Sequence, residues 1–185
     1  MSAPGAFWVR WRVRVGYPLG AICLWLAWRA RPNWRSILIG GAVALVGLLI
    51  RASAAGYLRK SETLANSGPY ARTRNPLYFG SAFLAAGFAI ASRSWIAAAL
   101  LFAYFSIFYH AVMRKEEAEL SARFHSQFAA YQRRVPLFWP RLGATGAPPG
   151  PGFSWQQYLR NREYRAGIGV ALLMIVLGAM AVWGR

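Results

Sequence analysis

Five long segments without a charged side chain dominate this sequence and restrict the folds open to it. They cover residues 15–28, 36–50, 75–92, 94–113 and 166–184. A helix that crosses the hydrocarbon core of a bilayer needs about 20 residues, and the last three segments reach or approach that length. A chain with several such segments is expected to fold as an all-α integral membrane bundle.

The first two segments are shorter, and charged residues set their ends. The first reaches a spanning length if Arg10, Arg12 and Arg14 extend their charged groups to the membrane surface or into the bundle. The second continues toward Tyr57 past Arg51. With these extensions we predict about five transmembrane helices.

The charge of the chain is strongly positive. It has 22 Lys and Arg against 5 Asp and Glu, which gives a net charge of +17. A nucleic-acid-binding domain gathers such an excess on a polar surface. Here 57% of the residues are hydrophobic, and the basic residues lie at the ends of the apolar segments. We therefore expect membrane lipids as partners and no nucleic acid, while the oligomeric state stays open.

Basic residues are divided unequally between alternate connections, and this division orients the chain. Seventeen of the 22 lie before the first helix and in the connections 51–74 and 114–165, whereas the others lie in 29–35, at Arg93 and at Arg185. Cytoplasmic loops are enriched in Lys and Arg. We predict a cytoplasmic N-terminus, an external C-terminus and a site that faces the cytoplasm. The predicted location is the inner membrane of a bacterium.

Three regions follow one another along the chain. Residues 1–63 hold the N-terminal transmembrane helices. Residues 64–141 hold a helical hairpin, whose two helices are separated only by the turn at 92–94, and an amphipathic helix. Residues 142–185 hold a linker rich in Gly and Pro, a short interfacial helix and the last transmembrane helix.

The amphipathic helix shows one apolar stripe. Leu120, Phe124, Phe128 and Tyr131 recur at spacings of four, four and three, which is the period of a helix with one buried face. Pro136 lies beyond it and ends the pattern.

Scarce residue types exclude several kinds of site. The chain has no Asp, and its single Cys23 allows neither an intrachain disulfide nor a thiolate metal site. His110 and His125 lie fifteen positions apart, a poor start for zinc. We expect no metal, a core role for Cys23, and a packed His110 with proton transfer as its alternative role.

A basic turn precedes the third uncharged segment. Gly68 and Pro69 form a turn, and Pro76 suits the first position of a helix, where its missing N–H costs nothing. The free N–H groups and the dipole at a helix start attract anions, and Arg72 and Arg74 add positive charge there. The pattern predicts an anion site at this helix start, or alternatively a basic cap at the membrane surface.

Three of the five acidic residues gather just after the fourth uncharged segment, at Glu116, Glu117 and Glu119. Ionisable groups at a membrane boundary are costly to bury and often functional. One interpretation is a carboxylate that faces a cationic ligand. The other is an ion pair between Arg114 and Glu117, which lie three positions apart on one helix face.

The short hairpin turn brings the two charged stretches to the same end of two packed helices. We therefore predict that Arg74 and the pair Glu116 and Glu117 act at one site. The arginine and the glutamates either form an ion pair with each other or jointly hold a zwitterionic ligand. We favour the second.

These stretches, in this order, resemble the isoprenylcysteine carboxyl methyltransferase family and its phospholipid methyltransferase relatives. The pattern of those proteins is G-x-Y-x-x-x-R-[HN]-P-x-Y-x-G, then E-E-x-x-L, then an aromatic-rich helix that ends R-V-P. The matching residues here are Gly68, Tyr70, Arg74, Asn75, Pro76, Tyr78, Gly80, Glu116, Glu117, Leu120, Phe124, Tyr131, Arg134, Val135 and Pro136. The match lies within residues 64–141.

Three positions depart from the family pattern. Asn75 stands where the prenylcysteine enzymes typically have His, and His125 stands where the family usually has Gly. Phe128 stands where the family often has Tyr.

The resemblance implies S-adenosylmethionine as methyl donor and a lipophilic acceptor, which would be an isoprenoid carboxylate, a lipid head group or a hydrophobic thiol. It implies that arginine holds the carboxylate of the donor and that glutamate faces its ammonium or sulfonium group. The cofactor-binding residues that it implies are Tyr70, Arg74, Asn75, Pro76, Tyr78, Gly80, Glu117, Tyr131 and Arg134. The catalytic residues that it implies are Arg74, Arg114, Glu116 and Glu117.

Two other functions compete with this one. Membrane sterol reductases have a similar C-terminal module and use a reduced nicotinamide cofactor, but they are longer and differ where this chain has Glu116 and Glu117. A non-enzymatic membrane scaffold is the third possibility.

Overall fold

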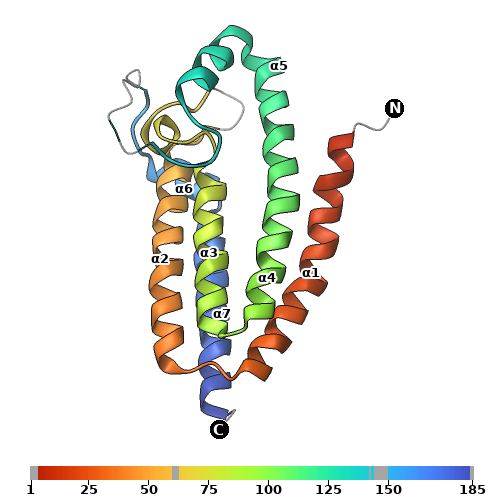
Figure 1. The fold of residues 1–185 in the computed structure, drawn as a ribbon. Helices are drawn as coiled ribbons and strands as arrows, with labels where there is room; N and C mark the ends of the chain where they lie inside the picture. Colours follow the sequence, from red (N-terminus) through yellow and green to blue (C-terminus); the bar gives the residue numbers. More distant parts are fainter. Residues whose placement is uncertain (1–3, 60–62, 142, 144–149, 184–185) are drawn as a thin grey trace. The chain divides into compact units, whose positions relative to one another are not determined.

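The computed structural model describes residues 4–59, 63–141, 143 and 150–183. Within these residues it contains helices and no strand, which confirms the all-α class. The predicted linker at 143–152 lies mostly outside the described residues. Figure 1 shows the helices, which are α1 (Pro4–Ala30), α2 (Trp34–Tyr57), the 3-10 helix η1 (Gly68–Ala71), α3 (Pro76–Ser92), α4 (Trp95–Tyr104), the π-helical turn η2 (Phe105–Tyr109), α5 (His110–Arg134), α6 (Trp155–Arg160) and α7 (Tyr164–Trp183).

Among the described residues, three helical stretches are long and apolar enough to cross a membrane. They are α2, the continuous path Trp95–Arg134 through α4, η2 and α5, and α7. The apolar helix α3 has 17 residues, and α1 is one continuous helix whose sequence contains Arg10, Arg12 and Arg14. The membrane bundle is therefore confirmed, while the count of five spans stays a prediction.

Local signals fix where several helices begin. The side chain of Asn33 accepts a hydrogen bond from the N–H of Ser36 at 2.9 Å, and Ser36 Oγ accepts one from the N–H of Asn33 at 3.2 Å. Ser94 caps α4 by accepting from the N–H of Ala97, so the hairpin turn between α3 and α4 is as short as predicted. These side chains satisfy N–H groups that a helix start leaves without a partner.

The chain divides into two compact units. Unit 1 comprises Met1–Leu45, Ala82–Lys115 and Gly169–Arg185, and unit 2 comprises Val46–Ser81 and Glu116–Ile168. Arg74 and Tyr78 from the first charged stretch, and Glu116 and Glu117 from the second, all lie in unit 2.

Unit 1 packs through small residues. A Cβ built on Gly87 of α3 would lie 2.6 Å from the carbonyl oxygen of Gly40 and 2.9 Å from Cβ of Ala44, both on α2. Glycine at these positions therefore lets two backbones approach closely, which is how helices associate in membranes. In the same unit α1 contacts α4, and Cys23 is a core residue with only 2% of its surface exposed, as predicted.

Unit 2 contains the amphipathic part of α5. Phe128, Tyr131 and Val135 form a buried cluster against which Leu120 and Phe124 pack, so the predicted apolar stripe is confirmed. The helix is broken at His125, whose φ of 41° and ψ of −112° are not helical. Such a backbone is strained for a residue with a side chain and natural for glycine.

The predicted interfacial helix at 156–165 is shorter in the structure, where α6 ends at Arg160. The chain turns because Arg162 has a φ of 55° and because Asn161 Nδ2 donates to the carbonyl oxygens of Ala55 and Leu58, both at 2.9 Å. A tertiary hydrogen bond to α2 thus ends the helix before α7 begins at Tyr164.

Candidate functional site

The segment before α3 is fastened to the segment after α5 by backbone hydrogen bonds. The N–H of Arg74 donates to the carbonyl oxygen of Pro136 at 2.9 Å, and the N–H of Arg141 donates to that of Arg72 at 3.0 Å. Thr73 is buried, and its Oγ1 donates to the carbonyl oxygen of Phe138 at 2.9 Å. The segment before α3 and the segment after α5 therefore form one structure. It is held together mainly by backbone groups, which carry no sequence signal.

Two predicted cofactor-binding side chains contribute to the same attachment. Tyr131 donates through its hydroxyl to the carbonyl oxygen of Tyr70 at 2.8 Å, and both residues are buried. Asn75 Nδ2 donates to the carbonyl oxygen of Leu137 at 3.0 Å. Both side chains hold the loop in place.

Gly68 allows the turn that starts this loop. Its φ is +57°, a conformation that residues with a Cβ rarely adopt. A Cβ at this position would also lie 2.6 Å from the ring of Tyr57. The glycine predicted as a turn residue is therefore required both for its backbone and for its close approach to α2.

Arg74 and Glu117 form an ion pair between Arg74 Nη1 and Glu117 Oε1. The two side chains are 10% and 8% exposed. Nε of Arg74 is buried and has no hydrogen-bond partner within the described part of the chain. Buried donors are nearly always satisfied, so a guanidinium with a spare buried N–H suits an additional anionic acceptor.

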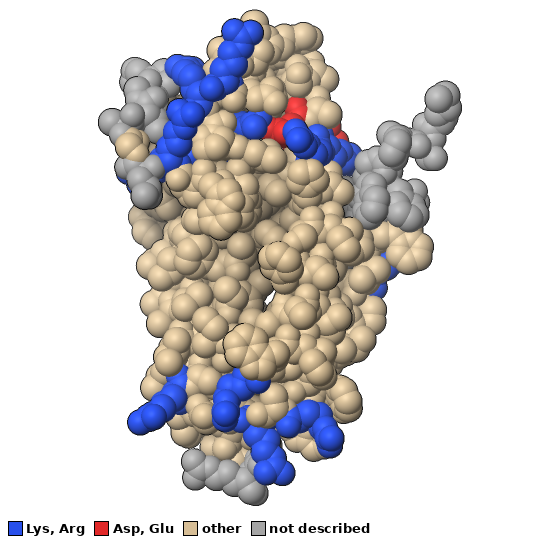
Figure 2. Space-filling view, in the orientation of Figure 1, with Lys and Arg blue, Asp and Glu red and all other residues tan. Residues whose placement is uncertain are grey.

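The neighbouring acid, Glu116, accepts a hydrogen bond from a second residue of the segment 74–78. The hydroxyl of Tyr78, in the first turn of α3, donates to Glu116 Oε1 at 2.5 Å. Each glutamate of the pair therefore contacts a different side chain of the segment 74–78. Figure 2 shows the acidic side chains on this face gathered in one place next to Lys and Arg.

Tyr70 is placed where its phenol stays neutral. Burial raises its pKa strongly, and the nearby Tyr131, Glu116, Glu163 and Tyr78 raise it further. A phenol in these surroundings can donate a hydrogen bond but is a poor source of negative charge.

The remaining predicted site residues are placed as follows. Pro76 is fully buried at the start of α3, as expected for the first helical turn. Arg134 is exposed, and its Nε donates to the carbonyl oxygen of Ala130 at 3.3 Å. Arg114 is exposed and belongs to unit 1.

Gly80 contacts another helix rather than an open space. A Cβ on Gly80 would lie 2.6 Å from Cγ of Arg51 and 2.8 Å from the carbonyl oxygen of Gly47, both on α2. The missing side chain therefore makes room for the side chain of Arg51.

Arg51 is the centre of a polar cluster that the motifs do not reveal. It pairs with Glu163, donates to Ser81 Oγ, and donates through Nη1 to the carbonyl oxygen of Leu77 at 3.3 Å. This cluster joins α2, the first turns of α3 and the turn before α7 within unit 2. In the sequence, the only sign of this cluster was Arg51, a single charged residue between two apolar segments.

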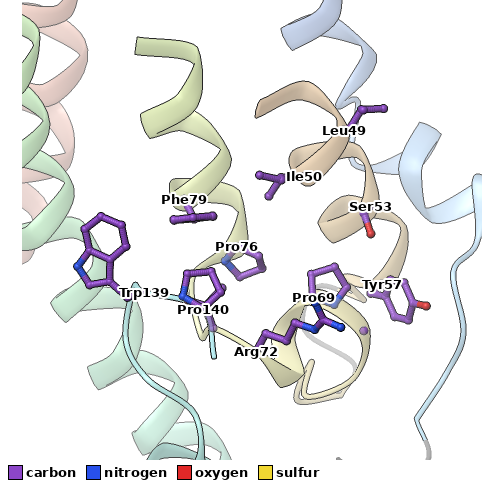
Figure 3. A pocket seen from close by; sticks show the side chains of 12 residues that line it. Leu49, Ile50, Ser53, Tyr57, Pro69, Arg72, Pro76, Phe79, Trp139 and Pro140 are labelled. Atoms are coloured by element: carbon purple, nitrogen blue, oxygen red, sulfur yellow. The ribbon is translucent and has the colours of Figure 1, made fainter. Parts of the chain in front are cut away.

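A cavity of about 880 Å³ lies within unit 2. Figure 3 shows its walls, which come from α2, from the loop at 68–73, from the start of α3 and from the segment after α5. The lining residues are Leu49, Ile50, Ser53, Tyr57, Gly68, Pro69, Arg72, Thr73, Pro76, Phe79, Trp139 and Pro140. Most of these side chains are apolar, and Arg72 is the one ionisable side chain with a permanent charge among them.

Comparison with known proteins supports the family predicted from the motifs. The sequence model of the phospholipid methyltransferase family matches residues 36–127 of this chain. The matched region includes the helical hairpin, Arg74, Glu116 and Glu117.

Two curated bacterial proteins are similar to the chain. The cobalt-zinc-cadmium resistance protein CzcN of Cupriavidus metallidurans is 36% identical over 140 residues, which cover 71% of this chain and 62% of that protein. The nickel-cobalt-cadmium resistance protein NccN of Alcaligenes xylosoxydans xylosoxydans is 34% identical over 141 residues, which cover 71% of this chain and 63% of that protein. The chain thus spans less than two thirds of the length of these relatives. No solved structure matches the chain significantly.

The names of these relatives refer to metal ions. Among the residues that the structure describes, no group of three or more His, Cys, Asp or Glu side chains is arranged to hold a metal ion.

Proposed function

We propose that this protein is an S-adenosylmethionine-dependent methyltransferase that acts on a lipophilic acceptor at the cytoplasmic face of a bacterial inner membrane. The observation that carries the proposal is the buried ion pair of Arg74 and Glu117, which lies inside the region matched by the phospholipid methyltransferase family. The amino-acid end of S-adenosylmethionine also carries both signs of charge.

The side chains present suit that cofactor. Arg74 has a buried N–H available for the carboxylate of the donor. Glu117 and Glu116 supply negative charge for an ammonium or sulfonium group, and Tyr78 supplies an aromatic face beside Glu116. When bound, the cofactor supplies an electrophilic methyl group.

The protein contributes position and electrostatics. The hydrogen bonds of Tyr131 and Asn75 keep the loop that carries Arg74 in one conformation, so the guanidinium needs little reorganisation to bind an anion. An in-line displacement depends mainly on such prior positioning of the two reactants. An acidic acceptor needs only to be held, whereas an amine, hydroxyl or thiol also needs a base to take its proton.

Calorimetry tests the proposal directly. Purified protein is titrated with S-adenosylhomocysteine and, separately, with reduced nicotinamide adenine dinucleotide phosphate. We expect binding of the first and not of the second. Binding of the nicotinamide alone would support the reductase alternative, and binding of neither would support a scaffold.

Metal resistance is a second candidate function, and the names of the two similar proteins favour it. Growth of a strain that lacks the protein is measured in cobalt, zinc and cadmium salts, with complementation by the natural chain and by Glu117→Gln. If resistance depends on the proposed methyl transfer, only the natural chain restores growth. Restoration by both would separate resistance from the Arg74–Glu117 site.

A further inference from the structure

We propose that four arginines at one end of unit 1 bind the phosphate groups of anionic phospholipids. Arg29, Arg31 and Arg35 lie around the connection between α1 and α2, and Arg93 forms the turn between α3 and α4. We call these four residues the arginine cluster. The inference is independent of the proposed methyl transfer, whose ion pair lies in unit 2.

The two connections that carry the cluster are fastened to each other. Ser36 Oγ donates to the carbonyl oxygen of Ala91 at 2.9 Å, and Arg93 Nη1 donates to that of Arg31 at 3.4 Å. Figure 1 shows both connections at the same end of the helices of unit 1. The four arginines therefore belong to one surface of that unit.

The protein supplies no negative charge to this surface. All four arginines are exposed, and the segments 1–45, 82–115 and 169–185, which make up unit 1, contain no Asp or Glu. Figure 2 shows Lys and Arg side chains gathered at the end where Figure 1 shows these connections, with no acidic side chain among them. Anions from outside the chain relieve the repulsion, and a guanidinium is well suited to phosphate.

The bias that orients membrane proteins does not account for the cluster. Basic residues are enriched in cytoplasmic connections. The four arginines instead lie in the two connections that we assign to the outside, where the same rule predicts few basic residues. A binding role at the membrane surface gives them a reason to be there.

The backbone at two of these residues also points to a role for the side chain. Arg31 directly follows α1 and Arg93 directly follows α3, with φ of 54° and 57°. Glycine usually occupies this position after a helix, because it adopts a positive φ without strain. The fold alone favours glycine at both positions, so the arginine side chains are expected to act in binding.

Tryptophans place the cluster at the level of the lipid head groups. Trp28, Trp34 and Trp95 adjoin the arginines in sequence and are exposed, and tryptophan is enriched where the hydrocarbon meets the head groups. Trp34 and Trp95 each begin a helical stretch long and apolar enough to cross a membrane. The exposed Leu38 and Ile96 follow within these stretches, so the acyl chains of a lipid held by the arginines contact apolar surface.

Photocrosslinking tests the site. The protein is reconstituted in phosphatidylcholine nanodiscs with a small fraction of phosphatidylglycerol that carries a diazirine in its head group, and the labelled peptides are identified by mass spectrometry. We expect labelling of the peptides that contain residues 29–35 and 93–95, with competition by unlabelled phosphatidylglycerol. Phosphatidylcholine that carries the same diazirine should label them roughly tenfold less. Glycerol 3-phosphate, a head group without acyl chains, should not compete, which distinguishes a lipid from a free phosphate.

A pair of glycine substitutions separates binding from folding. Arg31→Gly combined with Arg93→Gly removes two charges and relieves two strained residues. Each lost arginine should raise the phosphatidylglycerol concentration for half-maximal labelling roughly fivefold. The melting temperature in lipid-free detergent should rise, because glycine fits the positive φ. Arg29→Gln combined with Arg35→Gln leaves these backbone positions unchanged and should weaken the labelling by a similar factor.

Arg162→Gly is the matched control. Arg162 is also exposed and has a φ of 55°, but it lies in unit 2. This substitution removes the same charge and the same kind of strain. It should raise the melting temperature and leave the labelling of the peptides 29–35 and 93–95 unchanged.

Three results would overturn the inference. Equal labelling of these peptides by the anionic and the zwitterionic lipid would show ordinary contact with the bilayer. Unchanged labelling in the double glycine variant, with a lower melting temperature, would show that Arg31 and Arg93 serve the fold alone. An equal loss of labelling in Arg162→Gly would show that binding follows the total charge of the chain and not the arginine cluster.

Discussion

At the scale of single residues, the ion pair of Arg74 and Glu117 has two possible roles, and they differ in what mutation does. A buried pair that only stabilises the fold is needed for folding and not for binding. A pair that holds a zwitterionic ligand is needed for binding. Because both side chains are about nine-tenths buried, removing one of them strands a charge in either case.

A paired substitution separates the two roles. We expect Arg74→Met alone to lower the free energy of unfolding by about 3 kcal/mol and to abolish binding of S-adenosylhomocysteine. The double variant Arg74→Met with Glu117→Met should regain most of the stability, since two apolar side chains replace the pair, but it should still not bind. Thermal unfolding and calorimetry on all variants measure both effects. A double variant with normal affinity would refute the site.

A second residue-scale prediction concerns alkaline pH. Burial raises the pKa of Tyr70 above that of an unfolded tyrosine, so the folded state keeps the proton that the unfolded state releases. This contribution to stability is complete below about pH 10 and is lost as the pH rises further. The melting temperature should fall above this pH, and Tyr70→Phe should make the fall less steep. The exposed Tyr164→Phe is the control and should follow the natural chain; identical slopes for Tyr70→Phe would contradict the prediction.

At the scale of elements, the break in α5 lies at a position where the chain departs from the family pattern. His125 stands where the family usually has glycine, and its φ is +41°. Glycine adopts such a conformation without strain, whereas a residue with a Cβ loses on the order of 1 kcal/mol or more. The side chain is exposed, so its replacement removes no packing.

We therefore expect His125→Gly to stabilise the protein by about 1 kcal/mol, which corresponds to a melting temperature a few degrees higher. His125→Ala keeps the Cβ and removes only the ring, so it should give no comparable gain. Both melting temperatures are measured in the same detergent. Equal effects of the two substitutions would show that the backbone at this position is not strained.

The same elements show what the sequence could predict. The uncharged segments and Pro76 act locally, so the helices and the short hairpin followed from them. The hairpin in turn predicted that Arg74 and Glu117 lie close together. The hydrogen bonds from Thr73 and Asn75 were not predictable, because their acceptors are backbone carbonyl groups, which every residue has.

Long-range polar contacts escaped prediction for a related reason. Arg51 and Glu163 lie far apart in the sequence, and neither belongs to a motif. Their pairing depends on Gly80, which leaves space for the arginine. The resemblance implied Gly80 as a cofactor-binding residue, and only the structure identified α2 as its neighbour.

At the scale of the whole molecule, the direction of the chain in the membrane remains a prediction. Seventeen of the 22 basic residues lie in alternate connections that we assign to the cytoplasm. Reporter domains that are active in only one compartment, fused to each terminus in turn, test the assignment. We expect a cytoplasmic N-terminus and an external C-terminus. Two cytoplasmic termini would mean an even number of spans and would contradict the count of five.

The burial of Cys23 has a practical consequence for studying this molecule. The thiol is the only one in the chain, and just 2% of the residue is exposed inside the helical core of unit 1. A polar maleimide should therefore leave the natural protein unmodified. Any cysteine introduced at an exposed position becomes the single reactive thiol, so spin labels and fluorophores can be attached site by site without first removing a native residue.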